Sequence, residues 1–199
     1  MARRTQAQDD GGPGRLVFSD LMSADTTRRI VRWEVLSGLP GDGPIPFHFH
    51  LGHPTPWAEG FVVRFSNHDG TKWVGNFQGG YLGHSDVVLW PGANAVAVIA
   101  GGYCYFIDAG NPASYSTLGS QCQVSDTSFD EQRQMFFVTD SYWIYAYDVR
   151  RRPIWKNGPG EDITKIVSCR GGVLTVEVEE ETGGAKKTLR LSTQDGTTL

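Results

Sequence analysis

The residues best suited to chemistry lie in the stretch FHFHLGHPTPWAEG, which contains His48, His50, His53 and Glu59. His48 and His50 are two positions apart, so in an extended strand their side chains project from the same face. Two imidazoles presented in this way can bind a metal, and a third His with a Glu would complete a zinc or iron site. One hypothesis is therefore a metal-binding protein or a metal-dependent enzyme, such as an oxygenase, isomerase or hydrolase.

The same stretch resembles the cupin motif, in which an HxH pair is followed by a Glu. It departs from that motif because Glu59 follows His50 at a longer distance, and because the later segment WPGANAVAVIAG has the turn without a His after it. The alternative is that His50 and His53 brace the proline-rich loop against Trp57, while His48 faces solvent or an aromatic neighbour. The chain would then need no cofactor.

Other catalytic patterns are missing from the sequence, which favours a protein that is not an enzyme. There is no GxSxG nucleophile motif, and no Cys lies near a His along the chain. The glycine-rich segment GNFQGGYLGH has no Lys followed by Ser or Thr, and we interpret it as a turn rather than a phosphate-binding loop.

Candidate binding residues are Trp57 and the basic run Arg150, Arg151 and Arg152. Trp57 lies in a proline-rich loop that ends in an acidic residue, and exposed Trp side chains concentrate binding energy at interfaces. The basic run could dock an acidic partner. Core packing for the Trp and a solvated turn for the arginines are the alternatives, and both stay open at this stage.

The elements that must position these residues are short strands in a repeated pattern. Two segments match position by position, and each leads from an apolar strand through a tight turn into an aromatic strand that ends in Asp. A third copy follows them. The copies are Val98–Asp108 with the turn Gly101-Gly102, Val138–Asp148 with the turn Asp140-Ser141, and Val167–Val178 with the turn Gly171-Gly172. Self-similarity of this kind is typical of repeat architectures.

The copies are predicted to be β-hairpins, because two-residue polar or glycine turns between apolar runs supply the positive φ angles that match strand twist. In the second copy, alternation places Trp143, Tyr145 and Tyr147 on one face. It places Tyr142, Ile144 and Ala146 on the other. Since both faces are largely apolar, the strand is expected to pack between two layers.

The segment TDSYWIYAYDVRRRPIWKN resembles the quinoprotein-type and WD-type β-propeller repeat. In that repeat a strand ending in an Ala-Leu-Asp-like tripeptide leads by a turn to a Trp. The matching positions here are Ala146-Tyr147-Asp148 and Trp155. The resemblance implies a propeller-like architecture and implies nothing about a quinone cofactor.

The whole pattern predicts an all-β fold, a small or incomplete β-propeller-like array of antiparallel hairpins, with a β-sandwich or barrel as the alternative. Phe61–Phe77 would supply a degenerate fourth repeat, and Leu118–Asp130 a longer connection. Residues 1–15 are polar and glycine-rich and are expected to form a disordered tail. Residues 16–199 are expected to form a single β-repeat domain.

Composition narrows the classes of partner. The chain has 199 residues, a formal net charge of −4 and three cysteines, and its sequence pI is near 5.7. An acidic chain does not suit nucleic acid or an anionic membrane surface. The expectation is a cytoplasmic, non-enzymatic protein-interaction module, of which an immunity protein that neutralises a toxin would be one form. An exposed edge strand makes a homodimer plausible.

Overall fold

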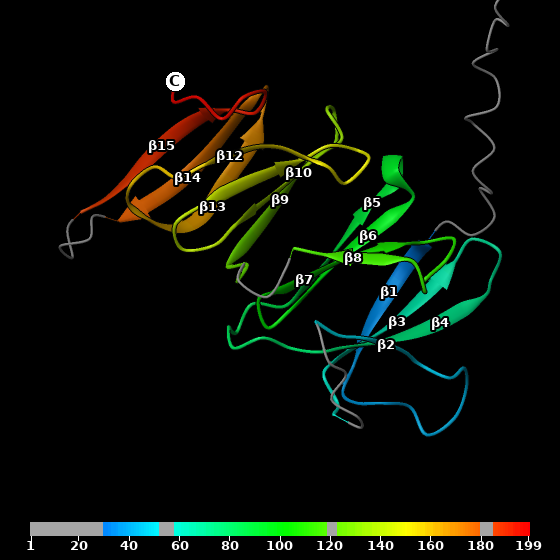
Figure 1. The fold of residues 1–199 in the computed structure, drawn as a ribbon. Helices are drawn as coiled ribbons and strands as arrows, with labels where there is room; N and C mark the ends of the chain where they lie inside the picture. Colours follow the sequence, from blue (N-terminus) through cyan, green and yellow to red (C-terminus); the bar gives the residue numbers. More distant parts are fainter. Residues whose placement is uncertain (1–29, 52–57, 119–122, 180–184) are drawn as a thin grey trace, which may run out of the picture.

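The computed structural model describes residues 30–51, 58–118, 123–179 and 185–199, and there the protein is built from four small β-sheets (Figure 1). The predicted tail, residues 1–15, lies outside the described residues. The sheets are antiparallel apart from one strand pair, and the described helical structure is a single short 3₁₀ turn, Pro91–Ala93. The prediction of an all-β, propeller-like array is confirmed. No described helix is long and apolar enough to cross a membrane.

The four sheets follow one another along the chain. The first has the strand order β1-β3-β4-β2, with β1 (Ile30–Leu36), β2 (Phe47–Phe49), β3 (Phe61–Asn67) and β4 (Lys72–Phe77). The second is formed in chain order by β5 (Asp86–Trp90), β6 (Ala95–Ala100), β7 (Tyr103–Asp108) and β8 (Tyr115–Thr117). The third is formed by β9 (Asp126–Asp130), β10 (Met135–Thr139), β11 (Ile144–Tyr147) and β12 (Pro153–Asn157). The fourth is formed by β13 (Asp162–Arg170), β14 (Val173–Glu179) and β15 (Lys186–Ser192).

Two of the predicted hairpin turns have the expected backbone. Gly101 and Gly102 have φ angles of 53° and 90°, and Gly171 and Gly172 have φ angles of 59° and 85°. Two consecutive positive φ angles define the turn whose twist matches the flanking strands, and glycine reaches them without steric cost.

The turn predicted at Asp140-Ser141 is different, and the prediction of a two-residue turn is wrong there. Strand β10 ends at Thr139 and β11 begins at Ile144, so the connection runs over Asp140–Trp143. None of its residues has a positive φ. Instead Asp140 Oδ1 accepts hydrogen bonds from the amides of Tyr142 and Trp143, at 2.8 and 2.7 Å. A side-chain acceptor therefore closes this loop, whereas the turns at positions 101–102 and 171–172 use glycine.

Strand β9 was not predicted, because it lies within the segment Leu118–Asp130 that the sequence marks as an irregular connection. Its sequence, DTSFD, has little of the apolar alternation by which a strand is recognised. It forms because β10 pairs with it from Asp126 to Asp130. It also lies against β13 of the next sheet, where Asp126 Oδ2 accepts a hydrogen bond from the Ile166 amide at 2.7 Å.

The third repeat copy, Val167–Val178, occupies a different place in its sheet from the first two. The hairpins of the first two copies, β6–β7 and β10–β11, are the second and third strands of their sheets. The third copy spans the end of β13 and most of β14, the first two strands of the fourth sheet. The copies share a hairpin pattern, but the third is displaced by one strand.

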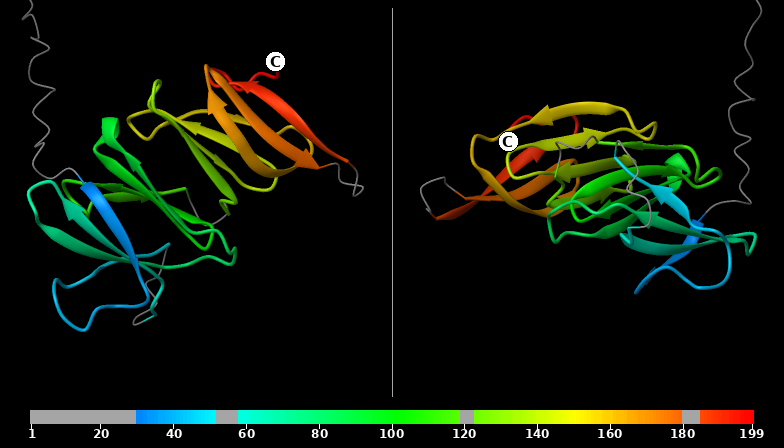
Figure 2. Two further views of the ribbon diagram at one scale, coloured as in Figure 1. Left: turned by 180° about the vertical axis from the view of Figure 1, so that it is seen from behind. Right: turned by 60° about the horizontal axis from the view of Figure 1, so that its bottom comes forward.

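Adjacent sheets are joined by three hydrophobic clusters, one at each junction. The first junction contains Phe65, Phe77, Val98 and Tyr105 among its buried residues. The second contains Trp90, Phe106, Phe136 and Tyr147. The third contains Phe137, Ile144, Leu174 and Val176. No cluster among the described residues joins the first sheet to the fourth, and Figures 1 and 2 show these two sheets at opposite ends of an open array.

The prediction that β11 packs on both faces is confirmed. Ile144 and Ala146 are buried in the cluster against the fourth sheet. Tyr147 is buried in the cluster against the second sheet, and Tyr145 packs at its margin. Tyr142 and Trp143, which the alternation also includes, precede the strand and are exposed. The single strand therefore separates two cores while its N-terminal end reaches solvent.

Candidate functional site

The structure places the candidate metal ligands around the first sheet. His48 lies in β2, next to Asn76 of β4, and its Nδ1 is 3.1 Å from the Asn76 side-chain amide nitrogen. The Nδ1 atom of His50 is buried without a hydrogen-bond partner. Glu59 Oε1 accepts a hydrogen bond from the Leu39 amide at 2.8 Å, so this carboxylate fastens the loop after β1. His53 lies outside the described residues.

The metal hypothesis for these residues gains no support from the part of the chain that the structure describes. That part contains no group of three or more His, Cys, Asp or Glu side chains placed to hold a metal ion. Asn76 links His48 to the loop, because its side chain also accepts a hydrogen bond from the Gly60 amide and donates one to the Ala58 carbonyl. The structure thus shows contacts to Asn76 for His48 and to Leu39 for Glu59, and the metal hypothesis, which also includes His53, stays a prediction.

The two described cysteines are poorly suited to nucleophilic chemistry. Cys104 is buried in the cluster between the second and third sheets. Burial raises the pKa of the Cys169 thiol to about 11, with a further contribution from the negative charge of Asp130. A thiol with such a pKa is almost fully protonated at neutral pH, and the thiolate is the reactive form.

The predicted basic run divides into two kinds of arginine. Arg152 is bound to Asp148, whose Oδ2 accepts hydrogen bonds from its Nε at 3.0 Å and from one of its terminal nitrogens at 2.7 Å. Arg150 is exposed and Arg151 half-buried, and neither forms an ion pair with a described residue. Trp57, the other predicted binding residue, lies outside the described residues.

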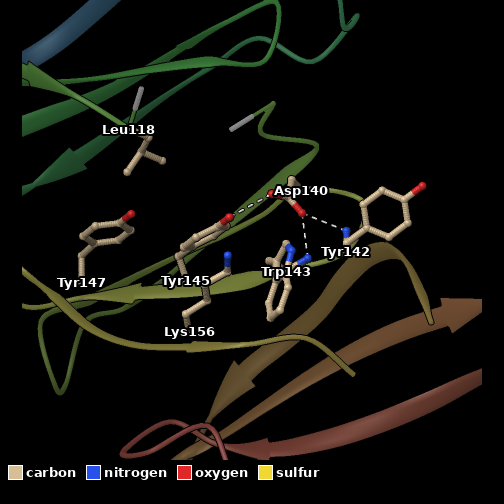
Figure 3. Close-up of a pocket in the computed structure, with 7 residues that line it drawn as sticks. All are labelled: Leu118, Asp140, Tyr142, Trp143, Tyr145, Tyr147 and Lys156. Atoms are coloured by element: carbon tan, nitrogen blue, oxygen red, sulfur yellow. Dashed lines mark hydrogen bonds between the residues drawn. The ribbon is translucent and has the colours of Figure 1, made fainter. Parts of the chain in front are cut away.

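The sequence did not single out a cavity that the structure contains on the aromatic face of β11. Its volume is about 350 Å³, and it is shown in Figure 3. It is lined by Leu118, Asp140, Tyr142, Trp143, Tyr145, Tyr147 and Lys156. In Figure 3, Leu118 lies across from Tyr145 and Tyr147, and Tyr142 points away from them at the other end.

The elements of the third sheet explain this arrangement. Trp143, Tyr145 and Tyr147 alternate along β11 and the residue before it, so they share one face. Lys156 of β12 is the direct cross-strand partner of Tyr145, so it stands among the same side chains. Asp140 holds the loop before β11 in place. Its Oδ2 accepts a hydrogen bond from the Tyr145 hydroxyl at 3.1 Å, and its Oδ1 accepts hydrogen bonds from the amides of Tyr142 and Trp143.

Lys156 and Gly158 fix the position of the Trp143 ring. The ammonium of Lys156 lies 3.8 Å from the centroid of Trp143 and 5.0 Å from that of Tyr145, which is close enough for cation–π attraction. On another side, a Cβ placed on Gly158 would come within 2.7 Å of the Trp143 ring carbons. The indole is therefore held between the Lys156 ammonium and the backbone of Gly158, where any larger residue would displace the ring.

The lining residues offer several kinds of contact to a ligand. The cavity offers aromatic faces, one ammonium, tyrosine hydroxyls and a carboxylate whose two oxygens already accept hydrogen bonds. No His, Cys or Ser is among the lining residues. The signal that could have located the site is the run SYWIYAY after Asp140, because it contains more aromatic residues than one buried strand needs.

Comparison with known proteins identifies the fold. No protein-family model and no curated protein sequence matches the chain. Among solved structures, Sqt1 of Saccharomyces cerevisiae is similar over 69% of this chain, with 13% identity and a TM-score of 0.50. BamB of Moraxella catarrhalis is similar over 57%, with 15% identity and a TM-score of 0.42. Sqt1 is a β-propeller protein, so its likeness indicates a propeller-type fold for the chain. The chain spans only 40% of the length of Sqt1 and 33% of that of BamB.

Proposed function

We propose that this protein is a non-catalytic protein-binding module, which holds a segment of another protein in the cavity beside Tyr142 and Trp143. The observation that carries the proposal is the exposure of these two aromatic side chains, both of which line the cavity. Tyr142 is 62% exposed and Trp143 is 41% exposed. Tyr and Trp are enriched among the residues that dominate binding energy at protein interfaces.

The local architecture supports this function because it holds the aromatic side chains in place before any ligand binds. Asp140 restrains the loop, Lys156 and Gly158 restrain the indole, and β11 lies between two packed cores. A surface that is already ordered loses less conformational entropy on association than a flexible one. The cavity therefore has the properties of a preformed binding pocket.

A photocrosslinking experiment tests the proposal. A photoreactive phenylalanine analogue is placed at Tyr142 in the full chain, expressed in its native cells, and irradiated. We expect one discrete adduct whose partner is identified by mass spectrometry. The adduct should disappear when Trp143→Ala is added, and it should weaken with Gly158→Ala, which displaces the indole. The partner, once purified, should bind the wild-type protein but not the Trp143→Ala variant.

The matched control is the same analogue at Tyr81, which is 88% exposed, lies in the loop before the second sheet and does not line the cavity. Identical adducts from both positions would indicate non-specific contact. No adduct from Tyr142, or an adduct that survives Trp143→Ala, would also overturn the proposal.

A finer form of the proposal is that the bound protein is a toxin, which this module neutralises in the cytoplasm as an immunity protein. Its support is limited to the modest length of the chain and the missing catalytic motifs in its sequence. The adduct decides the matter. If the captured protein is a toxin, the wild-type module should suppress its activity in a purified assay and the Trp143→Ala variant should not.

A further inference from the structure

We propose that the segment bound in this cavity is acidic: a peptide that places a carboxylate against Lys156 and an apolar or aromatic side chain against Trp143 and Tyr145. The inference rests on the proposed function and names the chemistry of its partner. It follows from a difference between the third and fourth sheets in whether their lysine side chains are paired with carboxylates.

The ammonium of Lys156 is held in place, but it has no carboxylate partner among the described residues. Its ammonium is held over two aromatic rings, and it forms no ion pair with a described carboxylate. Lysines on the fourth sheet differ, since Lys165 and Lys186 lie 3.7 and 3.0 Å from the carboxylate of Glu177. Aromatic faces attract the ammonium but leave its N–H groups free to donate hydrogen bonds, and a carboxylate is the acceptor that binds them most strongly.

Asp140 does not neutralise this cation. Its carboxylate accepts three hydrogen bonds, from the amides of Tyr142 and Trp143 and from the hydroxyl of Tyr145. These donors stabilise the carboxylate in its present position, and it forms no ion pair with Lys156. The carboxylate of Asp140 is thus hydrogen-bonded within the cavity wall, while the ammonium of Lys156 remains available to a ligand.

The turn that follows β11 carries two further cations. Tyr147 lines the cavity, and β11 ends at this residue. Arg150 and Arg151 follow in the β11–β12 turn, and neither is paired with a described carboxylate, whereas Arg152 is paired with Asp148. The strip from Lys156 to this turn therefore presents unpaired cations on a chain whose net charge is −4. Such local excess attracts and orients an acidic segment.

The test uses a displayed library of short random peptides, selected on the wild-type protein and counter-selected on the Trp143→Ala variant. Because Trp143 is partly exposed, circular dichroism is expected to show that this variant folds normally. We expect the enriched pool to contain more Asp and Glu than the input pool, together with aromatic or aliphatic residues. An enriched peptide should lose affinity when its Glu residues are replaced by Gln, and its binding should weaken as salt is added.

Charge variants then locate the contact. Lys156→Gln should weaken an enriched peptide roughly fivefold, the upper end for a partly exposed ion pair. Arg150→Gln with Arg151→Gln should weaken it by a smaller factor. The matched control is Lys72→Gln, which should leave the affinity unchanged. Lys72 is an exposed residue of β4 in the first sheet, and it does not line the cavity.

The outcomes separate the two proposals. A neutral or basic enriched pool, or binding unaffected by Lys156→Gln, would overturn the acidic ligand while leaving the protein-binding function intact. No enrichment on the wild-type protein over the Trp143→Ala variant would count against both. An acidic pool that depends on Lys156 supports both.

Discussion

At the scale of single residues, aspartates close the connections between strands. Asp108, Asp130, Asp140 and Asp148 each accept hydrogen bonds from two backbone amides of the residues that follow them. Asp108 and Asp148 are the terminal residues of the first two repeat copies. Their match in the sequence therefore has a physical cause, since a carboxylate at the end of the third strand organises the next turn in both sheets.

Asp148 makes this role testable. Burial alone would raise the pKa of its carboxyl, but the hydrogen bonds from the Arg152 guanidinium and the amides of Arg152 and Arg150 hold that pKa below its ordinary value of 3.8. We expect Asp148→Ala to lower the free energy of unfolding by about 1 kcal/mol at neutral pH, the usual loss for hydrogen bonds of this kind. Asp148→Asn should cost less, because it keeps an acceptor. Urea denaturation measures both.

The pH dependence of the same variants gives a second check. A carboxyl with a depressed pKa in the folded state stabilises the protein above the pKa of the unfolded chain. That contribution is lost as the pH falls through the folded value. The difference between the wild-type protein and Asp148→Asn should therefore be constant near neutral pH and vanish only below about pH 3.8, the ordinary pKa of the group. A difference that is already lost near pH 6 would contradict this assignment.

At the scale of the elements, each sheet packs only against its neighbours. Three separate clusters join the four sheets, and the central strands of the second and third sheets contribute to the clusters on both sides. In an array of this kind, stability is approximately the sum of the sheets and of their nearest-neighbour junctions. A substitution in one junction should therefore lower the stability of the two sheets that it joins more than the stability of the others.

Leu174→Ala in β14 tests this expectation. Leu174 is fully buried in the junction between the third and fourth sheets, so the substitution should cost about 3 kcal/mol. Amide hydrogen exchange should accelerate most in β13–β15, less in β9–β12, and least in β5–β8. Val173→Ala, a neighbour on the opposite face of the same strand, is the control and should have a small effect. Equal acceleration in all four sheets would show that the array unfolds as one unit.

At the scale of the whole molecule, the fourth sheet has one apolar and one polar face. Leu174, Val176 and Val178 pack against the third sheet. The intervening residues of β14 point away from it, and there Glu177 accepts a hydrogen bond from Lys186 and lies 3.7 Å from Lys165. The hydrogen bonds from Lys186 and Thr164 hold the pKa of Glu177 below its ordinary value, so the carboxylate stays charged at neutral pH. A charged face of this kind opposes packing of another sheet.

Removing this charged face should change the state of association. The double substitution Thr175→Val with Glu177→Val would give β14 a continuous apolar outer strip and leave Lys165 and Lys186 without their anion. We expect the variant to self-associate as its concentration rises, because exposed apolar patches promote contact between copies. Sedimentation velocity measures this effect, with Thr175→Ser and Glu177→Gln as the polar control. A variant that sediments like the control at every concentration would contradict the prediction.

Much of the hairpin structure could be predicted from local patterns in the sequence. Alternation in Tyr142–Asp148, the glycine pairs at positions 101–102 and 171–172, and the matching Asp108 and Asp148 were enough to predict buried hairpins in a propeller-like array. These features depend on neighbours along the chain, where strand period and turn geometry act directly. Spacing along the chain could not decide whether a metal site is formed by His48, His50, His53 and Glu59. Such a site depends on where separate loops meet in space.

The tertiary structure alone decided the polar strand β9 and the cavity on β11. Strand β9 exists because β10 and β13 offer it backbone and side-chain partners, and a sequence with little apolar alternation does not reveal that pairing. The cavity requires Leu118, Asp140 and Lys156 to meet around the β11 aromatic residues. Their meeting follows from sheet register and inter-sheet packing. Those are long-range interactions, and no local pattern in the chain encodes them.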